Sequence, residues 1–309
     1  MNSNHQAVDV VGFGMLTPVA ILVVDQLPEH NTGALIKEVS EFIFDDAAIV
    51  ACVMRQWGVR TGMIGTAVGD DPRGRSLARK LKSLGVQGKV RFSKEIQTPL
   101  EVDISDQSGA RTYFWHRLPH VLATLDTADL SMLDGARLLY VDWYDGDHIL
   151  RAMDEAIRLK VPVFLNLEHG HIEPDKLERY VSRATICQAV TDPAQRGEHD
   201  PRAVAEKLIQ QGAQTALITL AGEGCLAADQ HKIVRAWPLT IDVVDGCGAG
   251  ATFSAGFIYG FLRGMDLVKS IRFATVAAAL KVACAGLDMA PVSTIQSLTD
   301  KIRVEESAW

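Results

Sequence analysis

The sequence predicts an α/β protein built on a mainly parallel sheet, and three observations support that prediction. From about residue 133 onward, apolar runs alternate with helical patterns, which is typical of parallel strands joined by right-handed crossovers. Residues 8–13 form a short apolar run interrupted by Gly12 and followed by Gly14, as in a buried first strand. Residues 243–256 pass from a β-branched run through alternate glycines into a helix of small residues.

The N-terminal part of the chain predicts a small flap outside the main sheet. Residues 19–24 form a second apolar run directly after the first and are followed by a polar turn. Residues 98–104 and 111–115 are β-rich runs separated by the turn sequence 106–109, which predicts a hairpin. We expect this hairpin to complete the flap.

Two helices in the first third of the chain are predicted together with their caps. Asp45 and Asp46 precede a helical run over residues 47–57 and are suited to capping it. Asp71 is suited in the same way to the helix over 74–84.

The remaining elements follow the alternation. Strands are predicted over residues 61–65, 136–143, 161–167, 186–190 and 216–220, with a hairpin over 225–237. Helices are predicted over 147–160, 172–182, 249–263 and 267–285.

Composition limits the possible functions. The chain has 309 residues, 48% of them hydrophobic, which is enough for one substantial core, and we expect a single domain over residues 1–309. A net charge of −7 leaves no basic stripe for nucleic acid. No apolar stretch approaches the roughly 18 residues of a membrane span, and five dispersed cysteines suggest neither disulfides nor zinc. We therefore expect a cytoplasmic protein that binds neither nucleic acid nor membrane.

The alternate glycines predict an anion-binding turn. Gly246, Gly248 and Gly250 permit positive φ and close backbone approach. The unpaired N–H groups at the start of a helix from about Ala249 would face a phosphate. Such a turn suits a nucleotide.

This segment resembles the second signature of the ribokinase-like (PfkB) carbohydrate kinases, Asp-Thr-Thr-Gly-Ala-Gly-Asp-Thr-Phe followed by small residues. The positions that agree are Asp245, Gly248, Ala249, Gly250, Thr252, Phe253, Ala255, Gly256 and Phe257. The turn over residues 68–74 also resembles the family's Val-Gly-Asp-Asp-x-x-Gly element. The resemblance extends over about residues 8–297. It implies a three-layer sandwich with a mainly parallel sheet and a small β-sheet lid, formed by about residues 15–40 and 96–118.

The resemblance also implies an activity, which is ATP-dependent phosphorylation of a hydroxyl on a sugar or sugar-like molecule. ATP and Mg²⁺ are the implied cofactors, with a monovalent cation as a further candidate and no protein-held metal cluster. Gly248, Ala249 and Gly250 would form the anion hole. The other implied nucleotide contacts are Asp245 and Gly246 in the turn, and Thr219, Gly222 and Gly224 in a loop where Ala221 replaces the family's first glycine.

The sequence departs from the family at positions that carry chemistry. Ala251 stands where the family has the Asp that takes the proton from the acceptor hydroxyl. Val19 stands at the position of an Asp that binds sugar hydroxyls. Phe44, Asp45 and Ile49 replace the Gly-Gly and Asn of the first signature, and residues 191–194 do not match the Asn-x-x-Glu element. Asp45 and Asp46 could replace the lost polar contacts from a different backbone position.

Two further groups of residues are candidates for binding. Arg111 and Arg117 lie where the lid returns across the substrate mouth and could pair with an anionic group, or could be solvated lid charges or dimer contacts. His148, His169 and His171 lie near strand ends but lack the spacing of a zinc site. The apolar faces of the lid strands would be left uncovered in a lone flap, which predicts a homodimer through the lid.

Two interpretations of Ala251 remain open. In the first, the chain is an otherwise competent sugar kinase with a single engineered replacement, and it is inactive or very weak as written. In the second, it is a natural pseudokinase that binds nucleotide or sugar as a regulatory module.

Overall fold

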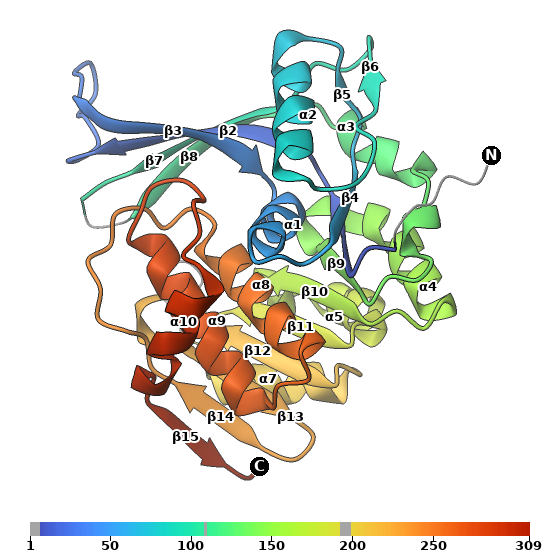
Figure 1. Ribbon diagram of the computed structural model, residues 1–309, viewed down its shortest axis with the longest axis vertical. Helices are drawn as coiled ribbons and strands as arrows, with labels where there is room; N and C mark the ends of the chain where they lie inside the picture. The colour runs from blue at the N-terminus through green and yellow to red at the C-terminus, as the bar shows by residue number, and fades with distance from the viewer. Residues whose placement is uncertain (1–6, 108–109, 192–198) are drawn as a thin grey trace.

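The computed structural model describes residues 7–107, 110–191 and 199–309, and it confirms the predicted α/β architecture. A central sheet runs through the molecule with helices on both faces (Figure 1). Its strands are β1 (Val10–Gly14), β4 (Thr61–Gly65), β9 (Leu138–Asp142), β10 (Val163–Glu168), β11 (Ile186–Val190), β12 (Thr215–Thr219), β13 (Cys225–Asp229), β14 (Ile233–Ala236) and β15 (Val304–Ser307).

The strand order is β15-β14-β13-β12-β11-β10-β9-β1-β4. Neighbouring strands from β4 to β12 are parallel, and those from β12 to β15 are antiparallel. The carboxyl ends of the parallel strands therefore meet at one edge, which is where open α/β sheets bind their ligands.

The helices form the two outer layers. One face of the sheet packs against α1 (Asp46–Gln56), α8 (Ala249–Leu262), α9 (Leu267–Val282) and α10 (Val292–Leu298). The other face packs against α4 (Leu150–Arg158), α5 (Pro174–Tyr180) and α7 (Pro201–Gln210). Successive strand residues alternate between these two cores, so that Tyr140 of β9 faces α8 while Val141 faces α4.

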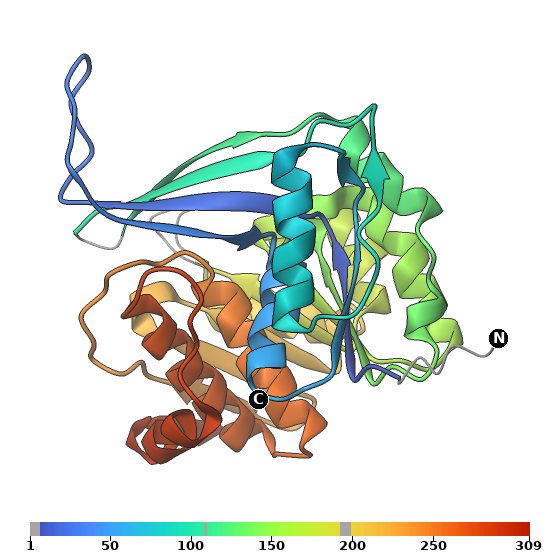
Figure 2. The same ribbon diagram turned by 45° about the horizontal axis from the view of Figure 1, so that its top comes forward.

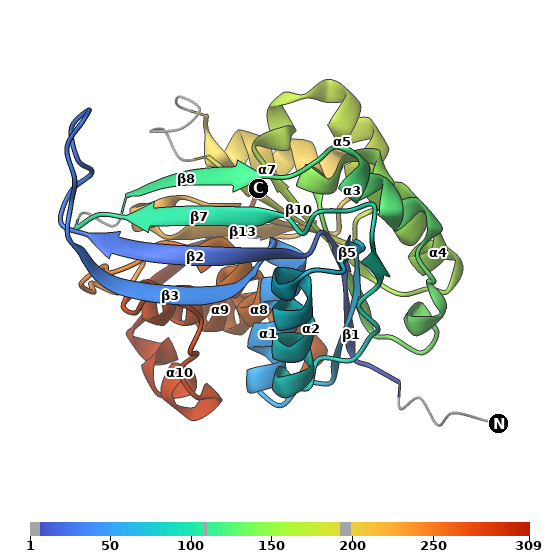
Figure 3. The ribbon, with the colours of Figure 1, turned by 90° about the horizontal axis from the view of Figure 1, so that it is seen from above.

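A four-stranded lid sheet lies across one end of the body (Figures 2 and 3). Its strands are β2 (Thr17–Val24), β3 (Ile36–Phe44), β7 (Leu100–Ser105) and β8 (Arg111–His116), in the order β3-β2-β7-β8. The predicted ranges 15–40 and 96–118 contain these strands except that β3 continues to Phe44, directly before α1.

The remaining elements are short or flank these layers. They are α2 (Pro72–Leu84), α3 (His120–Ala123), the strand pair β5 (Val68–Gly69) and β6 (Phe92–Ser93), and 3₁₀ turns at Thr124–Thr127, Ser131–Leu133, Trp143–Ile149, His169–Ile172, Val181–Arg183, Ala221–Glu223 and Thr299–Lys301. None of the helices in the described ranges is long and apolar enough to cross a bilayer.

Local chemistry explains where the predicted boundaries were right and where they were wrong. Asp45 accepts a hydrogen bond from the N–H of Asp46, and Asp71 from that of Gly74, so both predicted caps are confirmed. The helix expected from residue 147 begins only at Leu150, because Gly146 has φ +62° and separates two short turns.

Candidate active site

The glycine turn forms the N-terminus of α8. Gly248 precedes the helix with φ +75° and ψ 8°, and a Cβ placed on it would lie 3.2 Å from Leu287 Cδ2 and 3.4 Å from Ile49 Cδ1. The backbone conformation therefore favours glycine, and a Cβ would in addition force Leu287 to shift slightly. The N–H of Ala249 donates to the carbonyl of Gly246 over 3.2 Å, whereas those of Gly250 and Ala251 lie in the first turn, where a helix offers no carbonyl partner, so this end of α8 is suited to an anion.

Gly250 presents the open side of the same turn. A Cβ placed on Gly250 would meet only Gln188 Nε2 and Glu168 Oε1, each at 4.0 Å. Gln188 is held in place by Ser254, whose hydroxyl donates to Gln188 Oε1 over 2.9 Å. Of the proposed anion hole, Ala249 and Gly250 are partly exposed and Gly248 is buried beneath them. A ligand phosphate can therefore approach from the Gly250 side.

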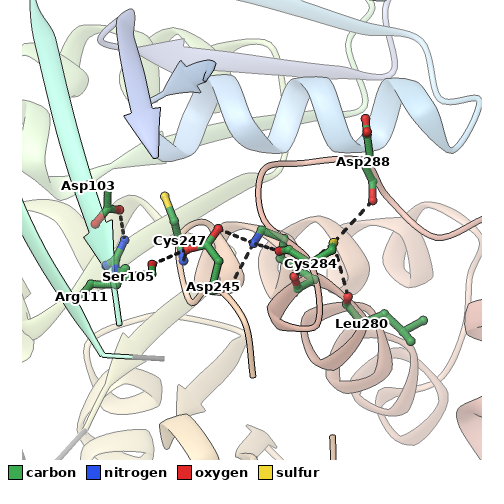
Figure 4. A network of polar contacts seen from close by, with 9 residues as sticks. Asp103, Ser105, Arg111, Asp245, Cys247, Leu280, Cys284 and Asp288 are labelled. Atoms are coloured by element: carbon green, nitrogen blue, oxygen red, sulfur yellow. Dashed lines mark hydrogen bonds and ion pairs between the residues drawn. The ribbon is translucent and has the colours of Figure 1, made fainter. Parts of the chain in front are cut away.

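Asp245 holds the turn from behind (Figure 4). Its fully buried carboxylate pairs with Lys281 Nζ at 3.0 Å and accepts hydrogen bonds from Ser105 Oγ at 2.8 Å and from the N–H of Cys247 at 2.9 Å. Ser105 belongs to β7, so this network joins the glycine turn to the lid. The carboxylate is fully engaged by the protein and shapes the turn. Its role as a nucleotide contact stays a prediction.

Three candidate positions are apolar and buried. Ala251 lies in the first turn of α8 with 1% of its surface exposed, Val19 lies in β2 with 3%, and Ile49 lies in α1 with none. None of these side chains can donate or accept a hydrogen bond. The polar contacts that the resemblance implies at these positions must come from other residues or be absent.

The candidate nucleotide loop follows β12. Gly224 has φ +89°, and a Cβ there would clash with Ala236 O at 2.3 Å, whereas a Cβ on Gly222 would meet open space. Thr219 donates to the carbonyl of Ala189 over 3.4 Å, and Gly246 is partly exposed. Nucleotide contact by these residues stays a prediction.

The two candidate arginines face carboxylates of the chain itself. Arg111 Nη1 lies 3.1 Å from Asp103 Oδ2, and the pair links β8 to β7 (Figure 4). Arg117 Nη1 lies 3.6 Å from Met15 Sδ, and its charge lowers the pKa values of Asp45 and Asp145 against the larger effect of burial, which raises them. The positive charge of both arginines is thus partly offset before any ligand binds.

A cluster of carboxylates is the main feature of the site that the sequence did not reveal. It is made of Asp45, Asp46, Glu101, Asp103, Asp142, Asp145 and Glu168, which surround the carboxyl ends of the parallel strands beneath the lid. Asn166 lies among them, and its Nδ2 donates to Asp46 Oδ2 at 2.9 Å, Asp142 Oδ2 at 2.8 Å and Glu168 Oε1 at 3.0 Å. Three carboxylates therefore converge on one amide nitrogen.

Burial and mutual repulsion raise the pKa values in this cluster. Burial raises the pKa of Asp45 to about 6, and burial together with Asp103 raises the pKa of Glu101 to about 7. Burial and neighbouring carboxylates raise the pKa values of Asp46 and Asp142 well above the usual range. Strongly perturbed acids grouped in this way are typical of functional sites.

A sequence signal for part of this cluster did exist. Asp142 lies near the end of the predicted strand 136–143, Asp145 comes shortly after it, and Glu168 directly follows the strand 161–167. Polar residues just after parallel strands collect at one sheet edge, so the topology alone places these three together. Asp45 and Asp46 are the members that sequence analysis did include.

His148 and His171 contact polar groups of the chain itself. His148 contacts Asp126 through its Nδ1 at 2.7 Å, and His171 Nδ1 lies 3.2 Å from the carbonyl of Glu168. Within the ranges that the structure describes, no group of three or more His, Cys, Asp or Glu side chains is arranged to hold a metal ion. The Asn-x-x-Glu positions 192–194 lie outside those ranges.

Comparisons with known proteins agree with this geometry. The model of the pfkB family carbohydrate kinases matches residues 46–294. The chain is 23% identical over 269 residues to an ATP-dependent 6-phosphofructokinase of Thermoanaerobacterium thermosaccharolyticum, covering 82% of this chain and 83% of the relative. It is 26% identical over 286 residues to a nucleoside kinase of Methanothermobacter thermautotrophicus, covering 89% of each.

Solved structures show the same fold. A putative ribokinase from Agrobacterium tumefaciens superposes with a TM-score of 0.83 at 20% identity, covering 96% of this chain and 98% of the other. The ribokinase-like sandwich and its separate small sheet, predicted from the sequence, are therefore confirmed.

Proposed function

Because the chain belongs to the PfkB family of carbohydrate kinases, we propose that it transfers the γ-phosphoryl group of ATP to a hydroxyl of a neutral or amino-bearing sugar or nucleoside. The proposal rests on one observation, which is that two chemically different surfaces face each other in the site. The open N-terminus of α8 faces the carboxylate cluster beneath the lid, because Glu168 Oε1 lies 4.0 Å from a Cβ placed on Gly250. Anion-binding N–H groups thus lie beside acceptors for substrate hydroxyls.

Each surface has a distinct task in phosphoryl transfer. The first-turn N–H groups of α8 would stabilise the negative charge on the transferred phosphoryl group. Carboxylates and Asn166 would fix the acceptor by hydrogen bonds to its hydroxyls. A divalent ion, when bound with the nucleotide phosphates, neutralises part of their charge.

The charge of the cluster restricts the acceptor. Seven carboxylates face two guanidinium groups, and Arg111 is already paired with Asp103. Even with several acids protonated, the site offers acceptors and negative charge in excess of positive charge. A neutral polyol or one bearing an ammonium group is therefore favoured over an acceptor that already carries phosphate or carboxylate.

Aromatic residues of the lid support a ring-shaped acceptor. Asp103 pairs with Tyr113 and Glu101 with Trp115 across β7 and β8, so these side chains share the lid face that holds the carboxylates. Tyr113 and Trp115 are 43% and 59% exposed and lie 5.5 Å apart by ring centroids. Exposed aromatic faces of this kind can stack on a sugar or base.

The test is ADP formation from ATP and Mg²⁺ with a defined acceptor panel: D-ribose, D-fructose, D-glucosamine, adenosine and fructose 6-phosphate. We expect turnover with at least one neutral or amino acceptor and little with the phosphate ester. Nucleotide binding without transfer to any acceptor would refute the kinase proposal.

A regulatory binding module is the second candidate function. Ala251, Val19 and Ile49 are apolar where the resemblance implies polar groups, and loss of a general base costs on the order of 10²–10⁴-fold in rate. With no other base in the site, the chain would bind nucleotide and transfer phosphate very weakly. The two candidates differ in whether another carboxylate can accept the proton.

A further inference from the structure

The end of β10 is distorted in a way that aims one carboxylate at α8. The register between β10 and β11 shifts between Asn166 and Glu168, and Glu168 has φ +46° and ψ −122°. A positive φ is uncommon for a residue with a side chain and is kept where the surroundings impose it, often at functional sites. The result is that Glu168 Oε1 lies 4.0 Å from a Cβ placed on Gly250.

We infer that Glu168 is the general base of this enzyme and replaces, from the opposite wall of the site, the carboxylate that α8 lacks at Ala251. The inference rests on the proposed kinase function. Glu168 is partly exposed and its Oε1 is oriented by the amide of Asn166 at 3.0 Å. Its side chain reaches from β10 to the first turn of α8, the turn in which Ala251 offers no carboxylate.

Neighbouring acids are less suited to this role. Asp142 is 1% exposed, and burial raises its pKa, as it does that of Asp46, so both tend to hold their protons. Asp245 is neutralised by Lys281 and lies behind the turn. Glu168 is the carboxylate that combines partial exposure with proximity to the first turn of α8.

The step is balanced without any further reactant. The acceptor oxygen forms a bond to the γ-phosphorus while the bond between that phosphorus and the bridging oxygen of ADP breaks. The proton of the acceptor hydroxyl passes to the Glu168 carboxylate, which later returns it to water. ADP leaves with the bridging oxygen.

Four proteins test the assignment: the unchanged chain, Glu168→Gln, Ala251→Asp, and the double variant. They are compared by the rate of ADP formation with the best acceptor of the panel above, and by ADP-induced thermal stabilisation.

Glu168→Gln should lower the rate by about 10²–10⁴-fold while leaving ADP binding intact. Ala251→Asp in that background should restore most of the rate, because it supplies a base from α8. Glu173→Gln, an exposed acid on the next turn, is the matched control and should change neither quantity.

The outcomes separate this inference from the proposed function. A rate within threefold of the unchanged chain for Glu168→Gln would overturn the inference and leave the kinase function standing. An inactive unchanged chain together with an active Ala251→Asp variant would also overturn the inference and leave the kinase function standing. If neither is active and both bind ADP, the kinase function itself fails, and the inference fails with it. If Glu168→Gln is poorly folded, Glu168→Asp takes its place, because it keeps the negative charge and shortens the side chain by one methylene. Glu168→Asp should show a reduced rate with ADP binding intact. An undiminished rate would overturn the inference.

Discussion

The hypothesis that nucleotide binds at α8 depends more on Gly248 than on any other single residue. Its φ of +75° is strained for a residue with a side chain, and a Cβ there would lie 3.2 Å from Leu287 Cδ2, which would have to shift. The residue therefore fixes the direction in which the first N–H groups of α8 point. Any side chain there must shift the turn.

We predict that Gly248→Val abolishes stabilisation by ADP. At a ligand concentration of a hundred times Kd, the unchanged chain should gain about 2.7 kcal/mol in free energy of unfolding, measured by thermal shift or urea unfolding. Gly264→Val is the matched control, because Gly264 also has φ +67° but a Cβ there meets open space, beyond the other end of α8.

A second variant separates binding from folding. Gly250→Val adds a side chain on the open face of the turn, with its nearest neighbours at 4.0 Å, and should fold normally. Persistence of ADP stabilisation in both Gly248→Val and Gly250→Val would show that the nucleotide does not bind at α8.

The Asp245–Lys281 pair should dominate the local stability of the turn. Both side chains are fully buried, and Lys281 also donates to the carbonyls of Asp245 and Cys284. Lys281→Met leaves the Asp245 carboxylate buried without its cation, and we expect a loss of about 3–5 kcal/mol in free energy of unfolding. Adding Asp245→Asn to Lys281→Met should recover part of that loss. A single-variant loss below about 1 kcal/mol in urea unfolding would contradict this account.

At the scale of elements, the start of α1 and strand β7 contribute two acids whose ionisation opposes folding. Asp45 caps α1, and Glu101 lies on the inner face of the lid. Their pKa values are raised to about 6 and about 7 in the folded protein. Because the folded state binds protons more tightly than the unfolded state, stability is present at low pH and is lost as pH rises through these values.

We therefore predict that the ligand-free protein loses stability between pH 4 and pH 7. The raised pKa of Asp45 alone corresponds to about 3 kcal/mol, at 1.36 kcal/mol for each pKa unit. Asp45→Asn, which keeps a capping oxygen, should flatten the profile and stabilise the protein more at pH 7.5 than at pH 4.5 in urea unfolding. Asp242→Asn, at an exposed position, is the control and should leave the slope unchanged. An equal effect of Asp45→Asn at both pH values would count against the raised pKa.

The elements also show what sequence could and could not predict. The parallel strands, the glycine turn and both caps follow from local patterns, because apolar runs and capping residues act within a few positions. Strand β3 was not predicted, because the charged residues Lys37, Glu38 and Glu41 interrupt its apolar residues and make the segment look like a solvated turn. Its pairing with β2 becomes visible only in the structure. The carboxylate cluster depends on five separate elements coming together, which are α1, β9, the 3₁₀ turn after β9, β10, and β7 of the lid. The direction of the Glu168 side chain depends on the positive φ of that residue, which no local sequence pattern predicts.

At the scale of the whole molecule, the lid sheet has one face toward the body and one toward solvent. Side chains of β7 that alternate with its buried carboxylates point outward and are apolar, and they meet apolar neighbours on β2, β3 and β8 together with the polar residues Glu41, Thr112 and His116. The apolar part of this outer lid face is made of Ala20, Leu22, Val39, Val102, Ile104 and Phe114. Val39 and Phe114 are 61% and 62% exposed. A contiguous apolar sheet face of this kind marks an interaction surface more often than it marks a free one.

We predict that the outer lid face forms a homodimer. Two lids packed face to face would bury the exposed apolar side chains of both copies, and the paired sheets would hold the carboxylate cluster closed over the acceptor. Light scattering at micromolar concentration should give twice the chain mass of 33.6 kDa. The double variant Val39→Lys with Phe114→Lys should be a monomer, because it places like charges on the symmetric interface, whereas Ile157→Lys, at a 49% exposed position of α4, should remain a dimer. A monomeric mass for the unchanged chain, or a dimer that survives the lid variant, would refute assembly through this face.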